Sequence, residues 1–570
     1  MDERVAEHQA WPARAAMLAL LGAALGAAFD LLMEENDPFR TAVASFCAVG
    51  GITLAFTLER VRWLWSILFA LGCGLAASLV FYWNGSPAGW SAGDEWRVFA
   101  AVMAIAIAAP LFQSVRDEGR WRLAPSPIHA HGWTNIVLLA AACAFVLISF
   151  LLAQLLAELF NLIGIELLRE ALRESWIMGA LIGAALGAAT GLLRDRDKVL
   201  SLLQRVATTV LAVLAPILAA GLVLFVLALP FTGLAPLWEK TSATTPILLG
   251  AIAGAFLLAN AVIGNSPDEE AGGPVLRWSA RALGAVMAPL ALVAAISTWL
   301  RIDQYGFTPE RLWALVFVLV VLAVSGVYLW TLARGPFTWF QRVRFANIHL
   351  ALGICALALF LATPIVDFGA ISTRDQLARL QSGAVTPDEF DWAALRFDFG
   401  PAGRRALERL AESGSATTRT LARRSLAAKT RWPIVAGETA DSGRQPLPPR
   451  LRVTPAESRV PPVLLDLISV TGSCGVVECR IIFDAPDRAV LVGQPCPDCD
   501  LGVRLYAARN GTWREVEPVA PQSAPLDPPA GNAAAGRQRG ALADGRVEVR
   551  SVDKRQVFID GEPVGPVFDP

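Results

Sequence analysis

The dominant pattern along the chain is a series of long apolar stretches separated by short polar connections. A helix of about 20 apolar residues crosses the hydrocarbon core of a bilayer, which is about 30 Å thick. Eleven stretches reach this length, and they cover residues 11–33, 39–58, 61–83, 96–113, 132–156, 176–193, 206–230, 245–264, 277–299, 311–333 and 345–364. The pattern predicts an all-α polytopic membrane bundle of about eleven transmembrane helices over residues 1–364.

The pattern changes after residue 364. Helix signals dominate residues 365–436, where Ser372 or Thr373 is expected to cap a helix that runs to Leu380. Residues 437–459 are rich in Pro, Gly and Ser and are predicted to form a linker. Residues 460–570 contain short strand-like runs separated by turn residues, and the predicted strands are 463–470, 480–483, 489–492, 502–507, 546–552 and 556–559. We therefore expect a C-terminal soluble region that is first helical and then a small β-rich domain.

Composition supports the membrane class and excludes several functions. The chain is 55% hydrophobic and 17% charged with a mean hydropathy of +0.49, which is too apolar for an average soluble domain. Its net charge of -1 provides no basic field for nucleic acid. The four histidines are scattered along the chain, so we expect neither a metal site built on them nor a cofactor.

The distribution of basic residues between alternate connections predicts the orientation. Cytoplasmic loops carry the excess of Lys and Arg, and here the two sides hold sixteen and seven of these residues. The richer side includes Arg4, Arg14 and the connections after the even-numbered stretches, whereas the poorer side leads into the C-terminal region. This split predicts a bacterial inner-membrane protein with a cytoplasmic N-terminus and a periplasmic C-terminal domain.

The sixth apolar stretch carries four glycines at intervals of four residues, namely Gly179, Gly183, Gly187 and Gly191. Glycines at this spacing share one helical face, where a neighbouring backbone can approach closely. The spacing predicts tight helix packing within the chain, and a homodimer face or a hinge for a moving helix are the alternatives. Gln154, Asn260 and Thr298 are polar groups within the spans that we expect to bond across helices.

Four cysteines gather in the C-terminal region as Cys474-x4-Cys479 and Cys496-Pro-Asp-Cys499. In a periplasmic compartment this pattern predicts two disulfide bonds, whose pairing the sequence leaves open. A four-cysteine zinc site is the main alternative, and a redox-active pair is a further one. Cys47, Cys73, Cys143 and Cys355 lie in apolar stretches and are interpreted as packing residues.

The first connection on the predicted periplasmic side is acidic, with Asp30, Glu34, Glu35 and Asp37. Multi-pass polyprenyl-phosphate-dependent glycosyltransferases resemble this arrangement, because they place an acidic residue in the first extracytoplasmic loop. Such a carboxylate acts as a general base or holds a divalent cation. The simpler interpretation is that outer loops are acidic where inner loops are basic. The sequence contains no phosphate-binding loop and no nucleophile elbow.

Two stretches carry a family resemblance: RIDQYGFTPER over residues 301–311, and ISTRDQLARL over 371–380 with Phe390-Asp391 and residues 397–403. With the helix count they resemble a bacterial family of multi-pass membrane proteins described as domain of unknown function 4153. The resemblance covers the membrane part to about residue 410 and implies no activity. In physical terms, Thr308 is predicted to cap a helix in which Pro309 is the first residue and Glu310 complements the dipole.

These observations favour an uncharacterised membrane protein of the bacterial envelope with a non-enzymatic role as scaffold, sensor or assembly factor. The alternatives are the lipid-linked glycosyltransferase above and a transporter or channel. The expected partners are the lipid bilayer and an envelope protein or lipid-linked molecule.

Overall fold

The fold was analysed in a computed structural model of the 570-residue chain. In the N-terminal part it describes residues 11–428 apart from 12, 34–36 and 235–242. Beyond these it describes residues 451–455, 458, 460–471, 479–493, 502–509, 512–516, 541, 544, 546–552, 554–559 and 562–568. The chain divides into two compact units, Met1–Arg419 and Thr420–Pro570.

Unit 1 is a bundle of long apolar helices. They are α2 (Ala13–Met33), α3 (Pro38–Thr57), α4 (Trp63–Asn84), α5 (Asp94–Glu118), α6 (Pro125–Leu162), α8 (Ser175–Arg194), α9 (Asp197–Thr232), α11 (Thr244–Ile263), α12 (Pro274–Tyr305), α13 (Pro309–Arg334) and α14 (Trp339–Ala362). Within the described residues, 11 helices are long and apolar enough to cross a membrane. The predicted number of spans is therefore confirmed, and the protein is a multi-pass membrane protein.

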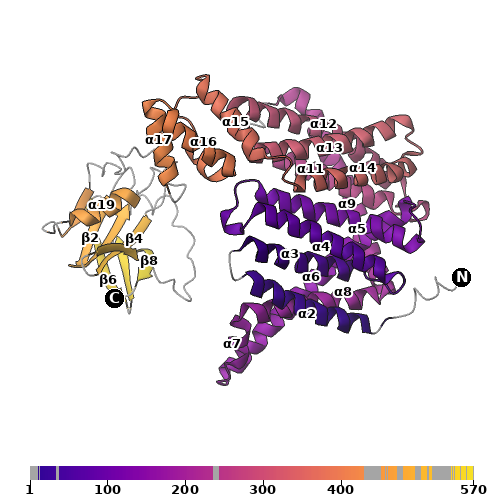
Figure 1. The fold of residues 1–570 in the computed structure, drawn as a ribbon, viewed down its shortest axis with the longest axis horizontal. Coiled ribbons are helices and arrows are strands. Elements are labelled where there is room, and N and C mark those ends of the chain that lie inside the picture. Colours follow the sequence, from indigo (N-terminus) through magenta and orange to yellow (C-terminus); the bar gives the residue numbers. More distant parts are fainter. Residues whose placement is uncertain are drawn as a thin grey trace. The chain divides into compact units, whose positions relative to one another are not determined.

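The spans form two groups that lie side by side (Figure 1). In the first group α2 contacts α8 and α3, α4 contacts α3 and α5, and α6 contacts α5 and α8. In the second group α12 contacts α9, α11 and α13. Buried side chains of α9, α11, α12, α13 and α14 form an apolar core that includes Tyr328 and Trp339. Contacts of α14 with α5 and of α6 with α9 join the two groups.

Helix α6 continues beyond the predicted apolar stretch 132–156. Residues 158–162 continue α6, and a turn through Gly164, whose φ is 82°, separates them from α7 (Leu167–Arg173). No residue of α7 is buried. The end of α6 and α7 project away from the other helices (Figure 1).

Because the spans alternate in direction, their ends define two sides of the bundle. We call the side that holds the first residues of α2, α4, α6, α9, α12 and α14 the arginine side. The opposite side continues into α15 (Phe368–Gln381), the π-helix η3 (Ala394–Asp398), α16 (Gly400–Ser413) and α17 (Ala416–Ala427), and we call it the juxtamembrane side. The 3-10 helices η1 (Pro87–Gly89) and η2 (Pro267–Glu269) lie in connections.

Helix α15 begins earlier than predicted. Asp367 is its N-cap, and the Asp367 carboxylate accepts a hydrogen bond of 2.9 Å from the Ala370 N–H. The predicted caps Ser372 and Thr373 lie inside the helix, where the Thr373 hydroxyl donates to the Gly369 carbonyl at 2.7 Å. A hydroxyl satisfied by the preceding turn fits a helix interior, which is why the cap prediction was wrong.

Unit 2 contains two sheets, which confirms a β-rich C-terminal region. The first has the order β1-β2-β3-β4-β5, with β1 parallel to β2 and the other pairs antiparallel. The second has the antiparallel order β6-β7-β8. The strands are β1 (Leu451–Thr454), β2 (Cys479–Ala485), β3 (Arg488–Gly493), β4 (Gly502–Arg509), β5 (Thr512–Val516), β6 (Val547–Val552), β7 (Lys554–Ile559) and β8 (Glu562–Phe568).

Two elements of unit 2 correct the sequence expectation. Residues 463–470 belong to helix α19 (Pro462–Thr471) and not to a strand, because Leu464, Leu467 and Ile468 follow helical spacing and pack on one sheet face. Strand β1 lies inside the predicted linker 437–459. The domain boundaries at 364, 436 and 459 remain predictions.

Candidate functional site

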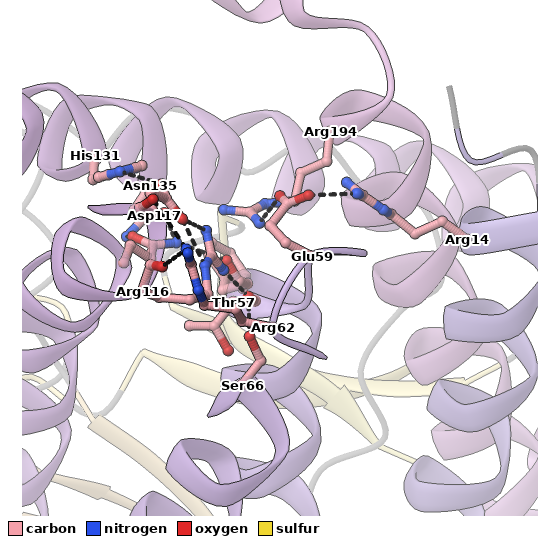
Figure 2. Close-up of polar contacts among 12 residues, drawn as sticks. Arg14, Thr57, Glu59, Arg62, Ser66, Arg116, Asp117, His131, Asn135 and Arg194 are labelled. Carbon is pink, nitrogen blue, oxygen red and sulfur yellow. Dashed lines mark hydrogen bonds and ion pairs between the residues drawn. The ribbon is translucent and has the colours of Figure 1, made fainter. Parts of the chain in front are cut away.

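An ion-pair network on the arginine side joins helices that are distant in sequence (Figure 2). Glu59, between α3 and α4, lies between two arginines: its Oε2 is 2.6 Å from Arg14 Nη2 of α2, and its Oε1 is 2.7 Å from Arg194 Nη1 of α8. Arg14 Nε also lies 3.6 Å from Asp195 Oδ1. The two arginine side chains are 6% and 7% exposed, so their charges depend on these partners.

The same network continues to α5 and α6. Arg116 is 3% exposed and donates to the Thr57 carbonyl at the end of α3. It also forms an ion pair with Asp117. The Asp117 Oδ2 in turn lies 3.0 Å from His131 Nε2 of α6. Arg62 Nη1 donates to the carbonyls of Arg116 at 2.6 Å and Asp117 at 3.1 Å. Arg62 has a φ of 56°, and among the described residues it is the only non-glycine residue with a positive φ. Its two bonds to α5 hold this strained conformation.

We call this set of side chains the arginine network. It consists of Arg14, Thr57, Glu59, Arg62, Gln113, Arg116, Asp117, His131, Asn135, Arg194 and Asp195. Gln113 Nε2 donates to the Phe56 carbonyl at 2.9 Å, and Asn135 Nδ2 donates to Gln113 Oε1 at 2.8 Å. The network joins the ends of α2, α3, α4, α5, α6 and α8. Each charge has a partner of opposite sign or a carbonyl, which is the arrangement expected of a clamp that fixes helix positions.

A second polar cluster lies within the other helix group. Asn260 Nδ2 of α11 donates to Tyr328 Oη of α13 at 2.8 Å. The Tyr328 hydroxyl donates to Asn347 Oδ1 of α14 at 3.0 Å. Asn347 Nδ2 donates back to Asn260 Oδ1 at 2.8 Å. The three side chains form a closed ring, which confirms that Asn260 bonds across helices. Near it, Arg344 donates to the Ile263 carbonyl and pairs with Glu270, both at 2.8 Å.

The acidic residues predicted as a site have different environments. Asp37 is the N-cap of α3, and its carboxylate accepts from the Arg40 N–H at 2.9 Å. Asp30 lies against Gly179 of α8. Glu34 and Glu35 are outside the described residues. The structure thus gives Asp37 a structural task and does not bring the four carboxylates together in the part that it describes.

The glycines of the sixth span face α2. A Cβ atom on Gly183 would collide with the Gly22 carbonyl, one on Gly187 with the Leu18 carbonyl, and one on Gly191 with the Ala15 backbone. Gly179 lies against Gly26 and Asp30 in the same way. Of the clustered cysteines, Cys474, Cys496 and Cys499 lie outside the described residues, and Cys479 is buried at the start of β2.

A cavity of about 230 Å³ opens on the juxtamembrane side. Its walls come from the ends of α4 and α14, the loop before α5, α13, and the first residues of α15 and α16. The lining residues are Trp83, Asn84, Gly89, Ser91, Ala92, Gly93, Asp94, Arg97, Trp313, Pro364, Asp367, Phe368, Gly369, Phe399, Gly400, Pro401 and Arg404. It is the candidate ligand site of the chain, and we call it the juxtamembrane cavity.

The two family-like stretches contact each other beside this cavity. Gln376 Nε2 of α15 donates to the carbonyls of Tyr305 at 2.9 Å and Phe307 at 3.1 Å, and the Phe307 N–H donates to Asp375 Oδ2 at 2.8 Å. A Cβ on Gly306 would collide with Gln376 and Asp375, so this turn needs glycine both for space and for its φ of 76°. As predicted, Thr308 caps α13, with Pro309 at its start and Glu310 in its first turn.

These contacts explain why the two stretches occur in one chain: the first forms the turn before α13, and the second binds α15 to it. Sequence reasoning missed the contact, because its residues lie 68 to 71 positions apart and give no local signal. It missed the cavity, because the lining residues come from several separate elements. It also missed the arginine network, although Glu59, Asp117 and Asp195 beside arginines at helix ends are a usable sign. Within the described residues, no group of three His, Cys, Asp or Glu side chains is placed to hold a metal ion.

Comparison with known proteins identifies the family. No curated protein and no solved structure matches the chain. A family model described as domain of unknown function (DUF4153) matches residues 46–410, which include the second half of α3, all nine later spans and the juxtamembrane helices through most of α16. The match covers more than half of the sequence and includes both stretches that carried the resemblance. The chain therefore belongs to the DUF4153 family of membrane proteins.

Proposed function

We propose that the protein is a non-enzymatic scaffold of the bacterial cytoplasmic membrane, which holds its C-terminal region in the periplasm for envelope maintenance, sensing or assembly. One observation carries this proposal: the charged groups of the spans are gathered at the two sides, and the core of the second group between them is apolar. Every described Asp, Glu, Lys or Arg of a span lies within nine residues of a helix end. The core of the second group consists mainly of Ala, Leu, Ile and Val.

The two polar clusters support a rigid bundle. The arginine network fixes six helix ends, and the Asn260–Tyr328–Asn347 ring is closed on itself, so that its groups satisfy one another. A transport path needs polar groups that a passing solute can contact. A closed ring packed against Trp339 and Phe256 favours a fixed core over such a path.

The proposed orientation rests on charge. The arginine side carries Arg14, Arg116, Arg194 and Arg344 among its basic residues, and the cytoplasmic side of membrane proteins carries the excess of Lys and Arg. The juxtamembrane side and unit 2 would then be periplasmic. The glycosyltransferase alternative is less well supported, because the juxtamembrane cavity is lined by neither Asp30 nor Asp37.

We further propose that Cys474, Cys479, Cys496 and Cys499 form two disulfide bonds in the periplasmic region. The support is the spacing of the four cysteines in a region proposed to be periplasmic, where oxidising conditions favour disulfide bonds. Cys479 is buried at the start of β2.

Topology mapping tests the orientation. Reporter fusions after residues 120, 200 and 340 should report cytoplasm, and a fusion after residue 450 should report periplasm. Thiol labelling of a chain that keeps only the four C-terminal cysteines should require prior reduction. A cytoplasmic signal after residue 450 would contradict the proposal.

Complementation tests the scaffold role. In a strain that lacks the protein and shows an envelope defect, the full chain and the Asp30→Asn and Glu34→Gln variants should restore resistance to detergent. A chain that ends after residue 427 should be present in equal amount and should not restore it. Loss of rescue in a carboxylate variant that is present in normal amount would instead indicate an enzyme.

A further inference from the structure

The juxtamembrane cavity lies at the level of the lipid headgroups. Its walls include the last residues of α4, the first residues of α5, and Pro364, which follows the end of α14, and these are the points where spans leave the hydrocarbon layer. Trp83 lines the cavity and is 43% exposed, as expected of an indole in the interfacial layer. A ligand in this cavity would therefore be reachable from the membrane as well as from water.

The charges of the cavity include one unpaired group of each sign. Of its four charged residues, Asp94 and Arg97 pair with each other at 3.2 Å. Asp367 Oδ1 accepts the capping bond from Ala370, and no ion pair joins Asp367 or Arg404 to another described side chain. The cavity is electrically neutral overall and presents a free carboxylate and a free guanidinium. This arrangement complements a ligand that carries both a cation and an anion.

An unpaired donor faces the cavity. Trp313 is 4% exposed as a whole residue and lines the cavity, and its indole Nε1–H has no hydrogen-bond acceptor among the described residues. A Cβ on Gly93 would be 3.3 Å from Trp313 Nε1, so a glycine backbone leaves this nitrogen accessible. A ligand oxygen in the cavity would accept this hydrogen bond, because an indole N–H is a donor only.

The backbone around the cavity also favours an anionic oxygen. The first residues of α5, α15 and α16, which are Asp94, Phe368 and Gly400, all line it. Helices of this length carry partial positive charge at their N-termini, which attracts anions, although in α15 the Ala370 N–H already donates to Asp367. Gly369 and Gly400 keep side chains away from this region of the wall.

Size limits the ligand. At about 230 Å³ the cavity is smaller than the roughly 300–1,000 Å³ of sites for drug-sized molecules. It accommodates a headgroup but not acyl chains. We propose that the juxtamembrane cavity binds an ammonium-phosphate zwitterion, with the phosphate at Trp313 Nε1 and Arg404 and the ammonium at Asp367. A phosphatidylethanolamine headgroup and a soluble phosphoethanolamine share this chemistry.

Binding to the purified full-length chain in a non-ionic detergent tests the proposal by native mass spectrometry and calorimetry. The probes are dihexanoyl-phosphatidylethanolamine, dihexanoyl-phosphatidylglycerol, glycerophosphoethanolamine and glucose. The ethanolamine lipid should bind at least about 10-fold more tightly than the glycerol lipid, because only its headgroup pairs with Asp367. Binding of glycerophosphoethanolamine with equal affinity would identify a soluble zwitterion as a ligand, and binding of the lipid alone would identify a membrane ligand.

Variants locate the site. Arg404→Gln, Asp367→Asn and Trp313→Phe should each weaken binding of the ethanolamine lipid by about 10-fold or more, since each removes one polar contact. Asparagine keeps the capping ability of position 367. Arg405→Gln is the matched control, because Arg405 is exposed on the same helix and does not line the cavity. Equal melting temperatures would show that the variants fold.

Four results would overturn the proposal: no binding by the unchanged protein, equal affinity for the two lipids, stronger binding of glucose, or unchanged affinity in all three variants. The binding assay uses isolated protein, so its outcome is independent of the scaffold role proposed above.

Discussion

The contact between α2 and α8 gives the sharpest test of the packing. Gly183 and Gly22 approach so closely that a Cβ on either residue would lie well inside van der Waals contact with the carbonyl of the other. The atoms in conflict are backbone atoms, which cannot rotate away as a side chain does. A Gly183→Ala substitution must therefore separate the two helices.

The expected cost follows from overpacking, which destabilises by about 1–3 kcal/mol. A change of one to two kcal/mol alters the ratio of folded to unfolded protein by about 5- to 30-fold. Gly326→Ala is the matched control, because Gly326 lies inside α13 and no atom lies within 4 Å of its added Cβ. There the better helix propensity of alanine should stabilise by about 0.5–1 kcal/mol.

The assay is thermal unfolding of the full-length protein in detergent. It is monitored by the loss of helical circular dichroism and by the fraction of protein that stays monodisperse after heating. Gly183→Ala should lower the melting temperature and Gly326→Ala should not. The double variant with Gly22→Ala should cost less than the sum of the two single changes, because helices already separated by one methyl group accept the second more easily. Equal melting temperatures for the Gly183 and Gly326 variants would refute the reasoning.

Three further predictions concern the polar contacts. Glu59→Gln should destabilise the bundle by about 3 kcal/mol, because it removes the carboxylate that lies between two nearly buried arginines. The control is Glu412→Gln, at an exposed residue, which should have no measurable effect in the same unfolding assay. Tyr328→Phe should cost about 1–3 kcal/mol by opening the three-residue ring, and Tyr82→Phe, at a residue that is 54% exposed, should be neutral. Gln376→Ala removes two hydrogen bonds that hold α15 and should therefore speed amide hydrogen exchange in α15 by about 5- to 30-fold, while exchange in α12 stays unchanged. The same exchange rates in α15 of the variant and of the unchanged protein would contradict this role.

Local pattern was sufficient for the membrane architecture. The spans are determined by the number of consecutive apolar residues, and this property is written in each segment independently of the others. The cap at Thr308 and five of the strands in unit 2 were predictable for the same reason, since caps and strand periods involve neighbouring residues. The errors also arose locally: a short apolar run at 463–470 suits a buried helix as well as a strand.

The candidate sites were not predictable, because they join residues that have no sequence relation. The juxtamembrane cavity combines the ends of α4 and α14 with the starts of α5, α15 and α16. Its most informative atom, Trp313 Nε1, belongs to a tryptophan that looked like one more member of the interfacial belt. Only its place in the cavity wall, with no hydrogen-bond acceptor among the described residues, distinguishes it.

The sequence by itself determined that this chain crosses a membrane about eleven times, which side carries the positive charge, and that a β-rich region follows. These conclusions depend on hydrophobicity, length and charge, which act segment by segment. The tertiary structure alone decided which helices pair, which arginines share Glu59, and how two family-like stretches meet beside a cavity. Such contacts depend on the three-dimensional packing of helix ends, which no local pattern encodes.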